Sequence, residues 1–383
     1  MRFDPDRDNV LSERDEAKHT KLRSQMAFGY AGKENPSMEG TIDTHIAKLV
    51  SLISSKYIST DKDYRPLDFA LRTQFFTLDV ISDLAFGHPF GYLDADDDVF
   101  DYIKTTASAI PVIIMLGNLP WLARAVQSRL LRGILPKATD KVGFGAFIGV
   151  TNKVVAERYH PSAPSQPDML GAFKRHGLTE EEARGQTLLQ VIAGSDTTAT
   201  TIRSGLLFLI TNPIAYLRLQ AEIDTASAHG AISSPIRDEE ARKLPYLQAV
   251  IRETLRVVPP ASGAFFRTVP EGGDTIAGMY VPAGTQIGNS PLAMHHSKEI
   301  YGEDAEVFRP ERWVEEEDEE RLGKMKSTND LVFHYGRYRC LGESVAMMEF
   351  NKVFVELLRR FDFSLVNPRM PARYYNAVSF YGA

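Results

Sequence analysis

The sequence predicts a mainly α-helical fold with small β-sheets. Long stretches carry apolar residues at helical spacing, most clearly residues 42–57 and 68–87, whereas alternating strand-like stretches are few and lie late in the chain. The 383 residues are 43% hydrophobic and 25% charged, which is ordinary for a globular protein and sufficient for a large core. We therefore expect a helical body that carries small sheets.

The charge and the cysteine content of the sequence exclude several classes of function. The formal net charge is -6, and Lys and Arg are scattered without a basic stripe that would bind a phosphate backbone, so we expect no nucleic-acid partner. Cys340 is the only cysteine, which excludes an internal disulfide and a zinc site built from several cysteines. Residues 1–23 are dense in charge and lack an apolar h-region, so they are neither a secretory signal nor a membrane anchor.

The strongest predicted helix starts after Thr179. Thr179 and Glu182 have the spacing of a capping box, and the helical pattern continues to Asn212, where Pro213 follows. In its middle, residues 193–198 (AGSDTT) combine a glycine with short polar side chains that lower helix propensity. Either this segment opens the backbone ladder within one long helix, or it is an N-cap at which a second helix starts.

Other segments predict loops and strands. Residues 107–126 form the most apolar window, but Pro111, Gly117 and Pro120 interrupt it, so we expect a helix and a loop, either buried in the core or touching a membrane surface. The remaining segments are a Pro/Ser-rich linker or surface loop (160–168), a strand hairpin that turns at Pro282–Gly284 (275–288) and an acidic, solvated segment (315–320).

Cys340 lies in a glycine-bracketed loop, residues 333–342 (FHYGRYRCLG), that leads into an apolar helix. A sulfur near a helix amino terminus, with Arg337 and Arg339 beside it, is in a positive environment that favours the thiolate. A thiolate in a loop that allows close backbone approach is suited to be an axial ligand of haem iron. The alternative is a buried, inert cysteine.

Two charged patterns precede this loop. Glu253 and Arg256 are three residues apart on a predicted helix with apolar neighbours, so they form either an exposed surface pair or a buried pair that needs a third partner. Arg312, in FRPERW (308–313), offers that partner. The order along the chain is the polar helix centre, ExxR, PERW and then the cysteine loop.

This ordered set resembles the cytochrome P450 superfamily, the haem-thiolate monooxygenases, from about residue 10 to about residue 370. The resemblance implies haem b with Cys340 as the proximal iron ligand, in a single catalytic domain that spans residues 1–383. It also implies that Glu253, Arg256 and Arg312 form a structural ion-pair cluster behind the haem.

The resemblance assigns further roles around the haem. Asp196 and Thr197 take the catalytic positions for oxygen activation over the distal face. The implied haem-binding residues are His19 and Arg23 in an early propionate-binding helix, Arg267 as another propionate partner, and Phe333, Gly336 and Arg337 in the cysteine loop.

Two features depart from the family pattern. Tyr338 replaces the arginine that the family usually carries two residues before the cysteine, so that Arg337 or the Tyr338 hydroxyl would have to grip the propionate. The family's membrane anchor, first helices and most of one sheet should precede residue 10, so we expect a partial chain that begins near the propionate-binding helix. Residues 177–203 and 341–368 look most like filamentous-fungal members, including those similar to pisatin demethylase.

We therefore expect a monooxygenase that inserts one oxygen atom from O2 into an apolar small organic substrate, in fungal secondary metabolism or detoxification. A haem-thiolate isomerase or dehydratase and a non-catalytic truncated pseudoenzyme are the alternatives. The residues expected to wall the substrate pocket are Phe265, Phe266, residues 112–116 and Phe380.

Electrons must come from a partner protein, because the sequence contains no P-loop and no GxGxxG motif after a strand. The resemblance implies an NADPH-dependent flavoprotein reductase, and the cytoplasmic face of the endoplasmic reticulum membrane for a full-length relative, with peripheral membrane contact for this chain. The charges that would attract the reductase, or are simply solvated, are Lys18, Lys21, Arg337, Arg339 and Lys352.

Overall fold

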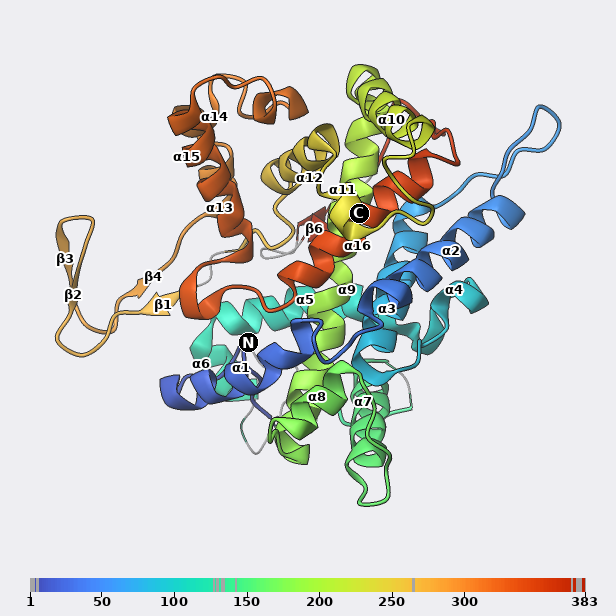
Figure 1. Ribbon diagram of the computed structural model, residues 1–383. Helices are drawn as coiled ribbons and strands as arrows, with labels where there is room; N and C mark the ends of the chain where they lie inside the picture. Colours follow the sequence, from blue (N-terminus) through green and yellow to red (C-terminus); the bar gives the residue numbers. More distant parts are fainter. Residues whose placement is uncertain are drawn as a thin grey trace.

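The computed structural model describes residues 4, 7–126, 128, 131, 135–141, 143–263, 266–372, 375–376 and 381–382. Helices form most of this part of the chain, and its named strands pair into three antiparallel sheets of two strands each (Figure 1). The predicted fold class, mainly helical with small sheets, is confirmed.

The helices up to the middle of the chain are α1 (Glu16–Tyr30), α2 (Met38–Lys56), α3 (Phe69–Phe86), α4 (Tyr92–Ala95), α5 (Tyr102–Asn118), α6 (Pro120–Val126), α7 (Gly143–Tyr159), α8 (Met169–Arg175) and α9 (Glu180–Thr211). Those that follow are α10 (Pro213–Ala228), α11 (Asp238–Ala241), α12 (Pro245–Val257), α13 (Pro291–His295), α14 (Lys298–Tyr301), α15 (Glu319–Asp330) and α16 (Glu343–Leu358). Short 3-10 turns include η3 (Pro310–Trp313), η4 (Leu331–Phe333) and η5 (Gly336–Tyr338).

Helix α9 is one continuous helix that begins at the predicted capping box. The Thr179 side chain accepts the Glu182 N–H, and the Glu182 carboxylate accepts the Thr179 N–H at 2.9 Å. The alternative of a second helix starting within residues 193–198 is therefore wrong. Gly194 lets α3 pack against this helix, because a Cβ there would lie 2.8 Å from Cγ1 of Ile81. Residues 180–211 are all α-helical, so the predicted opening of the backbone ladder is not seen.

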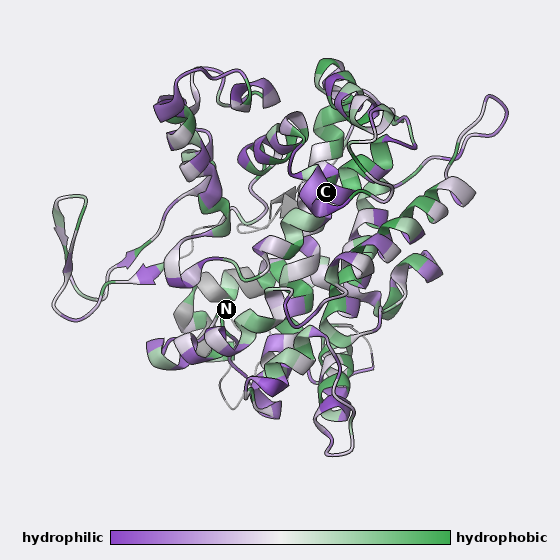
Figure 2. Cartoon of the chain, in the orientation of Figure 1, coloured by the Kyte–Doolittle hydropathy of each residue, from purple (hydrophilic) through white to green (hydrophobic). Residues whose placement is uncertain are grey.

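The main hydrophobic core is built around α9, against which α3 and α16 both pack, and Figure 2 shows apolar segments gathered there while the outlying α15 is largely hydrophilic. Its members include the fully buried Phe75, Val191, Ile202 and Val353. A smaller cluster of Ala249, Tyr301, Ala305, Trp313 and Met325 lies between α12, α14 and α15.

The sheets correct one prediction. Strand β2 (Asp274–Ile276) pairs with β3 (Met279–Val281), so the hairpin turns at residues 277–278, which both have positive φ (50° and 80°). Two central residues with positive φ give a turn whose twist matches that of the strands. A turn does form at Pro282–Gly284, where the Thr285 N–H donates to the Pro282 carbonyl at 3.3 Å, but it is not the turn of the hairpin as predicted: it links β3 to β4 (Gln286–Ile287), which pairs with β1 (Arg267–Thr268). The β2–β3 hairpin extends away from the helical body (Figure 1).

The apolar window at 107–126 forms α5 and α6. Helix α5 continues through Pro111, although the sequence predicted an interruption there. Because Pro111 is exposed, water can hydrate the backbone carbonyl group that it leaves unpaired. Within the described residues, no helix is both long enough and apolar enough to cross a membrane. Residues 160–168 connect α7 to α8 as a loop with one short turn.

Candidate functional site

The cysteine loop joins η4 to α16 and is closed by its own backbone. The Cys340 N–H donates to the Phe333 carbonyl at 2.8 Å, and Gly336 allows the turn between them with a φ of +60°. Backbone N–H groups of Gly342 and Glu343, at the start of α16, hydrogen-bond to the Cys340 sulfur. Because Cys340 is also exposed, the alternative of a buried cysteine is wrong, and its role as a ligand stays a prediction.

The electrostatics of the thiol differ from the expectation. Burial among surrounding protein atoms raises the pKa of the Cys340 thiol, and the two backbone N–H groups and the charge of Arg23 offset this only in part. The residue is exposed and yet closely surrounded, as is expected at the floor of a recess. Arg339 binds Glu343 through two contacts of 2.6 Å, and Arg337 binds Glu16 at 2.7 Å. The expectation that its flanking arginines make this thiol acidic is therefore wrong for the protein alone.

A short chain of contacts links the loop to α9. A Cβ on Gly342 would lie 3.9 Å from both the Cys340 sulfur and the Tyr30 ring, so these groups are adjacent. The Tyr30 hydroxyl hydrogen-bonds to Gln190 of α9. Gln190, Ala193 and Thr197 are three and seven residues apart and share one face of the helix, with about 10 Å between the first and the last along the axis.

This face of α9 opens in the middle of a helix that is otherwise largely buried. Ala193 is exposed and Thr197 is half-buried, although Val191, Ile192 and Ser195 are buried. The Thr197 hydroxyl donates to the Ala193 carbonyl at 2.9 Å, so its oxygen still has lone pairs for a further donor. The helix therefore presents a small surface with a hydroxyl group.

Asp196 carries the titratable group of this segment. The Gln74 side-chain amide, from α3, donates to Oδ1 of Asp196 at 2.7 Å, whereas Oδ2 is buried without a hydrogen-bond partner. Burial raises the pKa of Asp196 to about 6, with opposing contributions from Arg203 and Gln74. The carboxyl group can therefore gain and lose a proton near neutral pH.

His19, Arg23 and Arg267 gather beside the cysteine loop. Arg23 donates to the Arg339 carbonyl, the guanidinium of Arg267 lies 4.1 Å from the centre of the Tyr338 ring, and the His19 ring lies 5.1 Å from the same ring. His19 Nδ1 is buried without a partner, and burial lowers the pKa of both His19 and Arg23.

Among the described residues, neither Arg23 nor Arg267 forms an ion pair with a carboxylate. This set of groups fits a haem. The thiol of the exposed Cys340 suits the iron, and the unpartnered imidazole nitrogen and the two guanidinium groups without carboxylate partners suit the two haem carboxylates.

Arg337 and the Tyr338 hydroxyl are engaged elsewhere. Both bind the carboxylate of Glu16, at 2.7 and 2.6 Å, in the first turn of α1. The structure therefore engages both groups with Glu16, and the propionate contact that the sequence predicted for one of them stays a prediction. Glu16 was missed at the sequence level because nothing in the chain around it indicates a partner more than 300 residues away.

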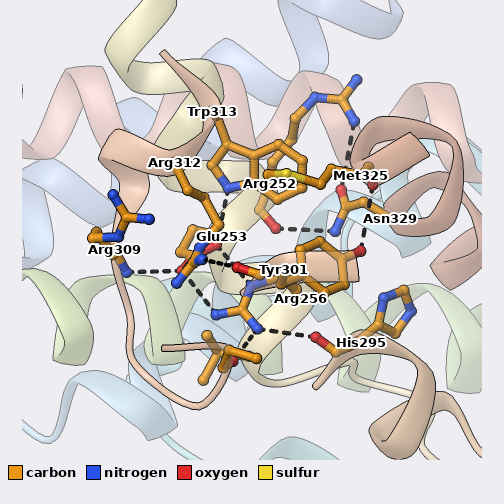
Figure 3. Close-up of polar contacts among 12 residues, drawn as sticks. Arg252, Glu253, Arg256, His295, Tyr301, Arg309, Arg312, Trp313, Met325 and Asn329 are labelled. Atoms are coloured by element: carbon orange, nitrogen blue, oxygen red, sulfur yellow. Dashed lines mark hydrogen bonds and ion pairs between the residues drawn. The ribbon is translucent and has the colours of Figure 1, made fainter. Parts of the chain in front are cut away.

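Glu253, Arg256 and Arg312 form one fully buried cluster (Figure 3). Arg256 binds both Glu253 carboxylate oxygens at 2.8 Å, and Arg312 binds Oε1 at 3.0 Å. The Trp313 indole N–H donates to Oε2 at 2.9 Å. The arginines also donate to the carbonyl groups of His295, Tyr301, Asp304, Ala305 and Val307. The alternative of an exposed surface pair is therefore wrong.

His295 is a further buried group that the sequence did not reveal. Its side chain is fully buried beside Arg256, and neither ring nitrogen has a hydrogen-bond partner. Burial, with the charge of Arg256, lowers the pKa of His295 to about 4, so the ring is neutral at physiological pH.

The comparisons with known proteins agree with this site. The family model described as cytochrome P450 matches residues 2–380. The chain belongs to the cytochrome P450 family. It is 45% identical to the cytochrome P450 monooxygenase ABA1 of Pyricularia oryzae and 40% identical to aba1 of Botryotinia fuckeliana, with 97% of this chain and 73% of each relative covered. It is 31% identical to the cytochrome P450 monooxygenase cfoH of Aspergillus candidus, over 97% of this chain and 70% of that relative.

These matches make the chain a cytochrome P450 monooxygenase, an oxidoreductase. The cytochrome P450 family implies a haem with a cysteine thiolate ligand, and Cys340 is the only cysteine of the sequence. The finer resemblance to pisatin demethylase stays a prediction.

One of the charges expected on the reductase-facing surface of this cytochrome P450 is not there. Lys352 is fully buried, and its ammonium group binds Glu39 at 2.7 Å and Asp43 at 3.0 Å. Lys18 and Arg337 are exposed but paired with Glu13 and Glu16. Of the expected pocket walls, Phe265 and Phe380 lie outside the described residues.

Proposed function

We propose that the chain binds haem b through the Cys340 thiolate and inserts one oxygen atom from O2 into an apolar small organic substrate. The observation that carries this proposal is Cys340, an exposed residue whose sulfur accepts hydrogen bonds from the Gly342 and Glu343 backbone N–H groups at the start of α16. A haem bound to a thiolate supplies the chemistry that splits the O–O bond. The biological setting that we propose is fungal secondary metabolism or detoxification.

The haem propionates would be held by His19, Arg23 and Arg267. An orphaned, buried imidazole nitrogen and two guanidinium groups without carboxylate partners support this assignment. Phe333 and Gly336 act indirectly, because the Phe333 carbonyl and the turn at Gly336 close the loop that presents the sulfur.

Asp196 and Thr197 would supply protons on the distal side. Asp196 has a carboxyl oxygen with no partner and a pKa of about 6, and the Thr197 hydroxyl keeps free lone pairs on the open face of α9. A positioned acid and an adjacent hydroxyl can pass a proton to a reacting group. This pair also favours a monooxygenase over an isomerase or dehydratase, which needs no such proton supply; consumption of NADPH in step with product separates them.

The two electrons would come from an NADPH-dependent flavoprotein reductase. The proposed place of the protein is the cytoplasmic face of the endoplasmic reticulum membrane, with peripheral contact through α5 and α6. Val112, Met115 and Trp121 support that contact, because these large apolar side chains are exposed on neighbouring helices. The chain as a whole, residues 1–383, would form one catalytic domain.

The test is the spectrum of Cys340→Ala. The purified parent should show a thiolate-type ferrous carbon-monoxide spectrum, and the variant should lose it, because the remaining sulfur atoms of the chain are methionine thioethers. Ser344→Ala is a control in the first turn of α16, since the Ser344 hydroxyl donates to the Tyr30 carbonyl and not to the sulfur. A normal spectrum in Cys340→Ala would overturn Cys340 as the iron ligand, whereas no haem in the parent would overturn the proposal as a whole and favour a pseudoenzyme.

A further inference from the structure

We propose that Tyr338 is a positioning residue for the haem propionates: its ring holds the Arg267 guanidinium in place, and its hydroxyl anchors that ring to α1 through Glu16. The inference rests on the proposed haem site and explains why this chain has Tyr338 where the family usually has an arginine. In this arrangement the positive charge for a propionate comes from Arg267, on a strand far from the cysteine loop in sequence.

The first step is the contact between Arg267 and Tyr338. The guanidinium carbon lies 4.1 Å from the ring centre, within the range of a cation–π interaction. Arg267 is exposed and lies on the two-residue strand β1, so local structure restricts its long side chain very little. A planar guanidinium group stacked on a ring loses most of its rotational freedom before any ligand arrives.

The second step is the anchor of the ring. The Tyr338 hydroxyl donates to Oε1 of Glu16 at 2.6 Å, and Arg337 binds Oε2 of the same carboxylate at 2.7 Å. These hydrogen bonds lower the pKa of Glu16, so this carboxylate stays ionised. The Tyr338 side chain is therefore fixed at its tip by α1 and leaves its face to Arg267.

The third step is the convergence of cations on one side of the loop. Glu16, His19 and Arg23 lie three and seven residues apart on α1, so the helix that anchors Tyr338 also carries the two other propionate candidates. The His19 ring lies 5.1 Å from the Tyr338 ring, and the charge of Glu16 acts on His19 as well. Tyr338 thus connects three segments, α1, β1 and the cysteine loop, at the place where an anionic group is expected.

The experiment measures haem loss from the holoenzyme. Tyr338→Leu and Tyr338→Phe are compared with the parent by the rate at which ferric haem transfers to excess apomyoglobin. Leucine removes the aromatic face and should speed haem loss about tenfold, whereas phenylalanine keeps the face and should stay within about threefold of the parent. The control is Tyr335→Leu, which changes an exposed tyrosine of the same loop and should leave the rate unchanged.

A double-variant cycle isolates the contact. Arg267→Leu should also speed haem loss, and adding Tyr338→Leu to it should have little further effect if the ring acts through Arg267. Thermal unfolding identifies any variant that fails to fold. If Tyr338→Leu fails to fold, the rates of haem loss from Arg267→Leu and Tyr338→Phe still test the inference. Parent-like haem retention in Tyr338→Leu, or additive effects in the cycle, would overturn this inference alone. Absence of a thiolate-type spectrum in the parent would instead overturn the proposed function.

Discussion

Asp196 shows how one side chain is placed to handle a proton. Its carboxyl group contacts the neutral amide of Gln74 through Oδ1, while Oδ2 is buried and unpaired. The titratable groups around it are the cationic Arg203, from its own helix, and the neutral Tyr102 hydroxyl of α5, whose pKa is raised by burial and by the charge of Asp196. A direct ion pair would hold the carboxylate ionised, whereas an amide partner leaves it near the point of protonation.

This environment predicts a pH-dependent stability difference between the parent and Asp196→Asn. The native pKa of about 6 lies above the unfolded value of about 3.9, so the native state binds the proton more tightly and stability falls as pH rises between these values. Asparagine removes this effect. Asp196→Asn should therefore be more stable than the parent by about 2–3 kcal/mol above pH 6, and the gain should vanish below about pH 4.

Denaturant unfolding of the holoenzymes at pH 4 to 8 measures this difference. Asp61→Asn is the control, because Asp61 is exposed in a loop. Parallel stability curves for the parent and Asp196→Asn would show that the carboxyl group is not perturbed as described.

At the scale of elements, the Glu253 cluster ties α12 to the segment that contains η3. Glu253 accepts hydrogen bonds from Arg256 on its own helix and from Arg312, Trp313 and the Arg309 backbone on the other segment. These two segments therefore share one carboxylate that is excluded from water. Such a cluster specifies how the segments dock, because any other arrangement leaves buried charges unpaired.

Glu253→Gln should be strongly destabilising. The amide keeps the shape but leaves the buried Arg256 with no opposing charge and Arg312 with Asp304 alone, at a cost of about 3–5 kcal/mol, a large share of ordinary domain stability. The variant should lose haem or fail to accumulate in folded form, measured by haem content and thermal unfolding.

Asp330→Asn is the control for this prediction. This change breaks an ion pair near the surface between Asp330 and Arg252, which lies on α12 as Glu253 does. It should lower the free energy of unfolding by less than about 1 kcal/mol. Equal unfolding temperatures for Glu253→Gln and the parent would mean that the cluster contributes little to stability.

At the scale of the whole molecule, Lys352 joins parts of the chain that the sequence separates widely. Its buried ammonium group, on α16, binds Glu39 and Asp43 of α2 and the carbonyl of Ile236, which precedes α11. Burial raises the pKa of Asp43, and Lys352 offsets this in part. Lys352 therefore stabilises the packing between elements and cannot be an exposed contact for a reductase.

Lys352→Met should destabilise the protein by about 1–3 kcal/mol, because Glu39 and Asp43, which are partly exposed, would lose the cation that both of them bind. The loss should shrink in acid, where these carboxylates take up protons. Lys48→Met, on α2, removes a more exposed ion pair with Asp94 and should cost less than about 1 kcal/mol. Denaturant unfolding at neutral and acidic pH measures both, and a loss that does not depend on pH would contradict this account.

The sequence by itself determined the features that depend on near neighbours in the chain. The capping box of Thr179 and Glu182 and the pair Glu253 and Arg256 require residues three positions apart, and local spacing reveals both. The order of the motifs then indicated the family. The hairpin turn was misplaced because a Pro-Ala-Gly sequence is a strong local turn signal, while the turn observed at residues 277–278 depends on which strands pair.

Only the tertiary structure decided which partner each charge has. Gln74 reaches Asp196 across 122 positions of sequence, Lys352 is buried instead of exposed, and Glu16 takes both Arg337 and the Tyr338 hydroxyl. Spacing in the chain carries no record of such contacts, because they depend on how whole helices pack. Ion pairs and burial determine the pKa of a side chain and which of its hydrogen-bond donors stay free. Whether a charged residue is available to bind a cofactor therefore follows from the packed fold.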